Sequence, residues 1–108
     1  MSKKTSRTVE INEAEKLQLE GAIALALISA PNPFLWHTRT ISIDNIVEEV
    51  RNFLSWSKKQ VKRIINAIKE ALVSWLPAGW VIHNEEKKCI IVLKSAELFF
   101  ERLAQNVA

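Results

Sequence analysis

Two amphipathic segments that follow one another almost without a break constrain the fold of this chain most strongly. In residues 43–54 the apolar side chains recur at spacings of three and four, and the same pattern returns in residues 57–76. These spacings place the apolar side chains of each segment on one face of an α-helix. Because little more than Ser55 and Trp56 separates the segments, the two helices must cross at a steep angle.

The start of the second segment is unusually cationic. Its first two turns contain no carboxylate, and the first acidic residue is Glu70. Ser57 is expected to cap this helix, with Gln60 at the capping-box position. The cations are Lys58, Lys59, Lys62 and Arg63. Cations at a helix N-terminus oppose the helix dipole at about 0.3–1 kcal/mol each, so the cluster indicates an external anion. A solvated, solubilising face is the alternative.

The remaining sequence predicts two further helices. Asn12 and Glu15 form a capping-box pattern at the start of a helix that is expected to end near Ser29, before two prolines. The last helix is expected over residues 96–105, with Ser95 as its cap and an apolar stripe of phenylalanine, leucine and alanine. The pattern therefore predicts four helices in the chain.

Short strands are expected between the helices. Residues 80–83 and 88–93 are rich in strand-forming side chains and flank the polar tetrapeptide 84–87, a pattern typical of an antiparallel hairpin. Residues 38–41 suit a further short strand, after which Ser42 can cap the helix over residues 43–54. The predicted order is helix, strand, helix, helix, strand, strand, helix.

This order resembles that of the winged helix-turn-helix superfamily. The resemblance is carried by residues 54–65 (Leu-Ser-Trp-Ser-Lys-Lys-Gln-Val-Lys-Arg-Ile-Ile) and 75–82 (Trp-Leu-Pro-Ala-Gly-Trp-Val-Ile), and it extends over about residues 12–107. It implies an α+β winged-helix domain over residues 12–108, with a three-helix core, a β-hairpin wing and a C-terminal helix. Residues 1–11 are expected to form a flexible basic arm.

In that superfamily the second helix of the tight pair lies in the DNA major groove and the wing touches the backbone or the minor groove. The resemblance therefore makes helix 57–76 the expected recognition helix for double-stranded DNA in a small transcriptional regulator. Gln60 and Asn66 can pair with adenine and Arg63 with guanine, while lysines contact phosphates. The expected DNA-binding residues are Ser57, Lys58, Lys59, Gln60, Lys62, Arg63, Asn66, Lys69, Lys87, Lys88, Lys3, Lys4 and Arg7.

Two features depart from the pattern of the superfamily. Helix 57–76 is longer than the usual recognition helix, so its last turns are expected to serve the core or a partner. The hairpin tip carries Glu85 and Glu86 beside Lys87 and Lys88, and these two carboxylates would repel phosphates.

Composition excludes several other classes. The 108 residues suit one domain, and the single Cys89 suits a reducing, cytoplasmic setting. The longest apolar run, residues 21–28, is too short to span a bilayer. The chain lacks a Gly-rich phosphate loop, nucleophile motifs and metal-ligand spacing around His37 or His83, so we expect neither an enzyme nor a metal or cofactor site. The net charge is +3, and residues 57–108 carry nine cations against five carboxylates.

Alternatives remain at this stage. A winged-helix module could bind another protein without specific DNA binding, or bind RNA or single-stranded DNA through Trp56 and Lys58. Helix 12–29 is apolar over much of its circumference, which predicts a homodimer through this helix and helix 96–105. A large single-chain core is the competing explanation of that apolar excess.

Overall fold

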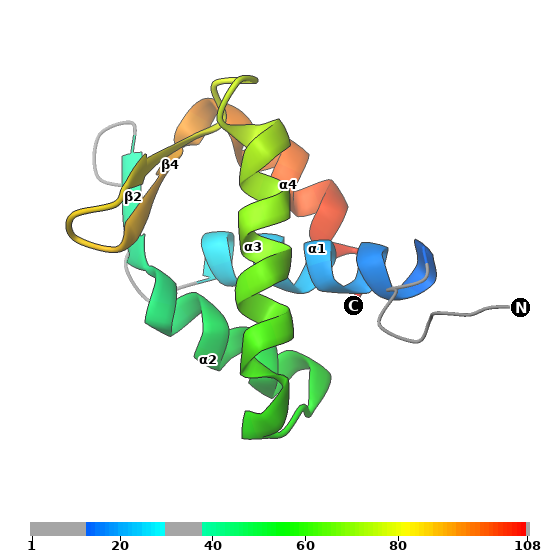
Figure 1. The fold of residues 1–108 in the computed structure, drawn as a ribbon. Coiled ribbons are helices and arrows are strands. Elements are labelled where there is room, and N and C mark those ends of the chain that lie inside the picture. The colour runs from blue at the N-terminus through cyan, green and yellow to red at the C-terminus, as the bar shows by residue number, and fades with distance from the viewer. Residues whose placement is uncertain (1–12, 30–37, 108) are drawn as a thin grey trace, which may run out of the picture.

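A computed structural model of the protein describes residues 13–29 and 38–107. These residues form four α-helices and a three-stranded antiparallel sheet, an α+β arrangement that is compatible with a winged helix (Figure 1). The helices are α1 (Glu13–Ser29), α2 (Ile43–Leu54), α3 (Val61–Trp75) and α4 (Glu97–Ala104). The strands are β2 (Thr38–Ser42), β3 (Val81–Asn84) and β4 (Cys89–Leu93), and the single 3-10 turns are η2 (Lys58–Gln60) and η3 (Lys94–Ala96).

The connection between α2 and α3 is as short as the sequence predicts. Ser42 caps α2, because its Oγ accepts a hydrogen bond from the Asn45 N–H at 3.1 Å. The helix ends at Leu54 and is capped by Ser55, which has a left-handed backbone (φ 56°) and donates its N–H to carbonyls of the last turn. Ser57 then caps η2 rather than α3, with its Oγ accepting from the Lys59 N–H at 3.3 Å. The α-helical part of the predicted segment 57–76 is therefore limited to Val61–Trp75.

Two predicted caps are wrong. Gln60 does not complete a capping box, because its side-chain oxygen accepts a hydrogen bond from Arg63 within the following turn. Ser95 does not cap the last helix, which is preceded by η3 and has Ala96 at its N-cap. Both errors have one cause, since a 3-10 turn precedes each helix and moves its first α-helical residue along the chain. Asn12, the predicted cap of α1, lies outside the described residues.

The predicted hairpin is confirmed and belongs to a larger sheet. Strand β4 lies in the middle, pairing with β3 (Asn84 opposite Cys89) and with β2 (Ser42 opposite Cys89). At the tip, the Asn84 Oδ1 accepts a hydrogen bond from the Lys87 N–H at 3.0 Å, and Lys88 has a left-handed backbone with φ 53°. The sheet joins α2 through the Ile43 N–H, which donates to the Lys88 carbonyl at 2.9 Å.

Helix α1 is the centre of the core. Its Leu19, Ile23 and Leu27 are fully buried, and α4, α2 and α3 all pack against it. Helix α4 approaches closely at Gly21, where a Cβ atom would lie 2.7 Å from the Leu103 carbonyl oxygen. Contacts within one chain therefore cover most of the apolar circumference of α1, while Leu17 in its second turn is 48% exposed.

One charged side chain lies within this core. Arg39 of β2 is 4% exposed on the inner face of the sheet. Burial lowers the pKa of its guanidinium, while the carboxylates of Glu49 on α2 and Glu97 on α4 raise it. An arginine stays protonated under these conditions, so Arg39 acts as a fixed internal cation between the sheet and two helices.

Candidate nucleic-acid interface

The outer side of η2 and α3 carries a row of exposed polar and cationic side chains. Lys62, Asn66 and Lys69 follow one another at spacings of four and three, so they lie along one line of the helix. Lys58 and Lys59 continue this line from η2, and all five side chains are exposed. We call these five residues the lysine face. In Figure 1, α3 runs along the front of the molecule and crosses in front of α1.

The opposite side of α3 fixes the helix in the core. Ile64, Ile68 and Leu72 are buried, and Trp75 is 3% exposed. The Trp75 ring meets the Phe100 ring of α4 edge to face, with 4.9 Å between the ring centroids. This packing anchors α3 along its inner side, so the lysine face is held on a rigid support. Trp80 also packs against the core, where its ring stacks on the Phe99 ring with 3.8 Å between the centroids.

The lysines of this face have no carboxylate partner among the described residues. Ion pairs seen in residues 13–29 and 38–107 include those of Arg51 with Glu48 and of Arg63 with Glu15. The first exposed acid along α3 is Glu70, which lies beside the lysine face. The lysine face is therefore an exposed, positively charged strip.

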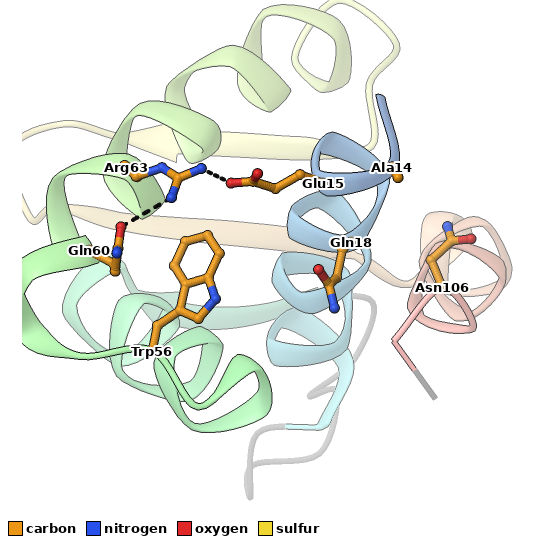
Figure 2. A pocket seen from close by; sticks show the side chains of 7 residues that line it. All are labelled: Ala14, Glu15, Gln18, Trp56, Gln60, Arg63 and Asn106. Atoms are coloured by element: carbon orange, nitrogen blue, oxygen red, sulfur yellow. Dashed lines mark hydrogen bonds and ion pairs between the residues drawn. The ribbon is translucent and has the colours of Figure 1, made fainter. Parts of the chain in front are cut away.

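Arg63 is the exception among the four cations at the start of this segment. Its guanidinium forms an ion pair with Glu15 of α1 and donates a hydrogen bond to the Gln60 Oε1 at 3.2 Å. It also lies over the Trp56 ring, 4.9 Å from the centroid. Figure 2 shows these side chains turned toward one another between α1 and α3. We call Glu15, Trp56, Gln60 and Arg63 the arginine cluster.

The arginine cluster changes one expectation from the sequence. The local sequence offers the cationic turn no carboxylate, yet the fold supplies Glu15 from α1. Gln60 and Arg63, which the sequence predicts to pair with bases, contact each other and their cluster partners in this structure. Sequence reasoning missed Glu15 as a partner because no local spacing links α1 to the start of α3.

A polar groove lies beside the arginine cluster. It has a volume of about 680 Å³ and opens between the first turns of α1 and the start of α3. Besides the cluster, its lining consists of Ala14, Gln18 and Asn106 (Figure 2). The groove leaves the outer edge of the cluster open to solvent.

The hairpin tip has mixed charge. Lys87 and Lys88 are exposed there, but so are Glu85 and Glu86. The hairpin therefore offers no net positive charge at its tip. The remaining predicted contacts in the arm, Lys3, Lys4 and Arg7, lie outside the described residues.

Metal-ligand clusters and membrane-spanning helices are both absent from the described residues. Residues 13–29 and 38–107 contain no cluster of three or more His, Cys, Asp or Glu side chains that could hold a metal ion. In the same part of the chain, no helix is both long enough and apolar enough to cross a membrane. His83 is half-buried in β3, His37 lies outside the described residues, and Cys89 is a free, buried side chain in β4.

Comparisons with protein-family models, curated proteins and solved structures found no match. The function proposed below therefore rests on the residues of this chain.

Proposed function

We propose that this protein is a non-enzymatic winged-helix protein that binds double-stranded DNA through the lysine face, as a small transcriptional regulator. The observation that carries the proposal is the row of exposed lysines on the outer side of η2 and α3, without a carboxylate partner among the described residues. Ammonium groups neutralise phosphates and release condensed counterions, which supplies most of the affinity in sequence-independent binding. An α-helix also fits the width of the major groove.

Asn66 supports a component of sequence readout. It lies between Lys62 and Lys69 on the lysine face, and its amide can donate and accept toward an adenine edge while the lysines contact the flanking backbone. Gln60 and Arg63 lie in the arginine cluster, so Asn66 is the one predicted base-reading residue that belongs to the lysine face. We therefore expect strong phosphate binding with modest sequence preference.

Neutralising two lysines tests the phosphate contacts. In Lys59→Gln with Lys62→Gln, the slope of log K against log salt for a short labelled duplex should become shallower by about 0.9 for each lost phosphate contact. The matched control, Lys94→Gln with Arg102→Gln, removes the same charge from exposed positions outside α3 and should leave the slope almost unchanged. Fluorescence anisotropy over a range of salt concentrations measures both variants. The proposal would be contradicted if the lysine-face variant and the wild type had equal slopes, or if the wild type did not bind the duplex at low salt.

Selection from random duplexes tests readout by Asn66. The wild type should enrich sites that contain a preferred adenine, favoured over other bases by about 1–3 kcal/mol of binding free energy. Asn66→Ala should lose this preference while retaining its affinity for non-specific DNA. Enrichment of a palindrome with half-sites roughly 34 Å apart would indicate a homodimer on the DNA. Unenriched duplexes from the wild type would reduce the proposal to sequence-independent binding.

A second candidate function is binding to another protein. Val73 continues the line of the lysine face and is 73% exposed, and Leu76 at the end of the helix is 40% exposed. An apolar end beside a cationic strip suits a partner surface that is acidic at one end and apolar at the other. In that case Val73→Ser would abolish capture of a defined partner, whereas DNA binding through the lysines would tolerate Val73→Ser.

A further inference from the structure

Arg63 lies next to the lysine face but does not belong to it. On α3 it follows Lys59 by four residues and precedes Asn66 by three, so it neighbours both along the helix surface. Its side chain is 41% exposed, which leaves it accessible from solvent. A change of side-chain rotamer would bring the guanidinium to the edge of the lysine face.

Three contacts hold Arg63 away from that edge. Glu15 supplies a carboxylate, Gln60 accepts a hydrogen bond, and Trp56 offers its ring. Of these three partners, only Glu15 is charged, and it comes from a different helix. Glu15 therefore decides how strongly the cluster competes with any external anion for the guanidinium.

We infer that Glu15 restrains DNA binding by competing with a backbone phosphate for Arg63. The inference rests on the proposed function of the lysine face. When duplex DNA lies on that face, a phosphate close to Lys59 replaces the Glu15 carboxylate, because a guanidinium forms charge-assisted hydrogen bonds with phosphate as it does with carboxylate. The exchange is feasible because ion pairs that are partly open to solvent are weak. Arg63 thus becomes an additional phosphate contact of the complex, and Glu15 sets how readily it does so.

The pair Glu15→Gln and Glu13→Gln isolates this effect. Both variants remove one carboxylate from the first turn of α1, but the Glu13 side chain is exposed and is not part of the arginine cluster. Duplex affinity should rise about two- to fivefold in Glu15→Gln and less than twofold in Glu13→Gln, as expected when a weak ion pair no longer competes. Glutamine keeps the size and hydrogen-bonding groups of the side chain, and circular dichroism confirms that each variant is folded.

A double-mutant cycle shows whether Glu15 acts through Arg63. Arg63→Gln should weaken duplex binding and reduce the salt slope by about 0.9. In that background Glu15→Gln should raise affinity no more than Glu13→Gln does, because the arginine for which Glu15 and a phosphate compete is absent. Equal gains in duplex affinity from Glu15→Gln and Glu13→Gln in the wild-type background would overturn the inference. So would a gain from Glu15→Gln in the Arg63→Gln background that is as large as in the wild type.

The outcomes separate this inference from the proposed function. If the wild type binds duplex DNA through Lys59 and Lys62 but Glu15→Gln behaves like Glu13→Gln, only the inference fails. If the wild type shows no salt-dependent duplex binding, the proposed function fails and takes the inference with it.

Discussion

The lysine face and the arginine cluster both draw on residues 56–69, to which the cluster adds Glu15 from α1, but their surroundings differ. Lys62 and Arg63 are neighbours in the chain, yet Lys62 points into solvent while Arg63 contacts Glu15, Gln60 and Trp56. The helix turns by about 100° between successive residues, which directs one cation outward and the next toward α1. A cationic run is therefore not one functional unit, because partners from other elements can engage part of it.

The largest expected effect comes from disturbing α1, which supplies Glu15. Gly21→Ala places a Cβ atom 2.7 Å from the Leu103 carbonyl oxygen, and the rigid backbone of α4 cannot yield cheaply. Overpacking of this kind costs about 1–3 kcal/mol, more than the gain in helix propensity. Urea denaturation should therefore show a loss of about 2 kcal/mol, whereas Lys16→Ala at an exposed position of the same helix should change stability by less than about 0.5 kcal/mol. A neutral or stabilising Gly21→Ala would contradict the packing of α4 on α1.

Reversing the charge of the neighbouring cations Lys62 and Arg63 should change the stability of the fold in opposite directions. Lys62→Glu should stabilise the fold by about 0.3–1 kcal/mol, because an acid in the first turn suits the helix dipole. Arg63→Glu should destabilise it by about 0.5–1 kcal/mol, since two carboxylates then face each other across the cluster. Thermal unfolding of the two variants at low salt makes the comparison, and each serves as the control for the other. If both variants were more stable than the wild type, the arginine cluster would contribute nothing to stability.

The smallest expected effect concerns the hairpin tip. Lys87→Gln with Lys88→Gln should lower duplex affinity only about twofold, because Glu85 and Glu86 already offset these cations and salt screens what remains. The matched comparison is Lys59→Gln with Lys62→Gln on the lysine face. If the double variant in the hairpin lowers duplex affinity as much as the double variant on the lysine face, the hairpin contributes to binding as strongly as the helix does.

Local patterns predicted the elements of this fold well. Apolar spacing placed α2 correctly, and the two prolines marked the end of α1. Ser42 caps α2 as expected, and the polar tetrapeptide marked the hairpin within one residue. These features depend on residues close together in the chain, whose geometry is set by backbone and side-chain rules alone. The α+β class followed from the same elements.

Partnerships between distant segments could not be predicted in the same way. Glu15 looked like a capping residue of α1, and nothing in its spacing pointed to Arg63. The apolar circumference of α1 suggested a second chain, although three helices of the same chain cover most of it and leave Leu17 exposed. Arg39 was similarly missed, because the carboxylates that interact electrostatically with it, Glu49 and Glu97, come from two helices far away in the sequence. Each case requires knowledge of which helix faces which, and that follows from the assembled core rather than from periodicity.

The central claim, that the lysine face binds duplex DNA, is tested most directly by titrating the protein with a short duplex and following its backbone amide chemical shifts. The largest changes should occur at Lys59, Lys62, Asn66 and Lys69, should weaken as salt is added, and should leave the outer turns of α4 unchanged. Changes confined to the apolar end of α3 at Val73 and Leu76, or no change at low salt, would contradict the claim.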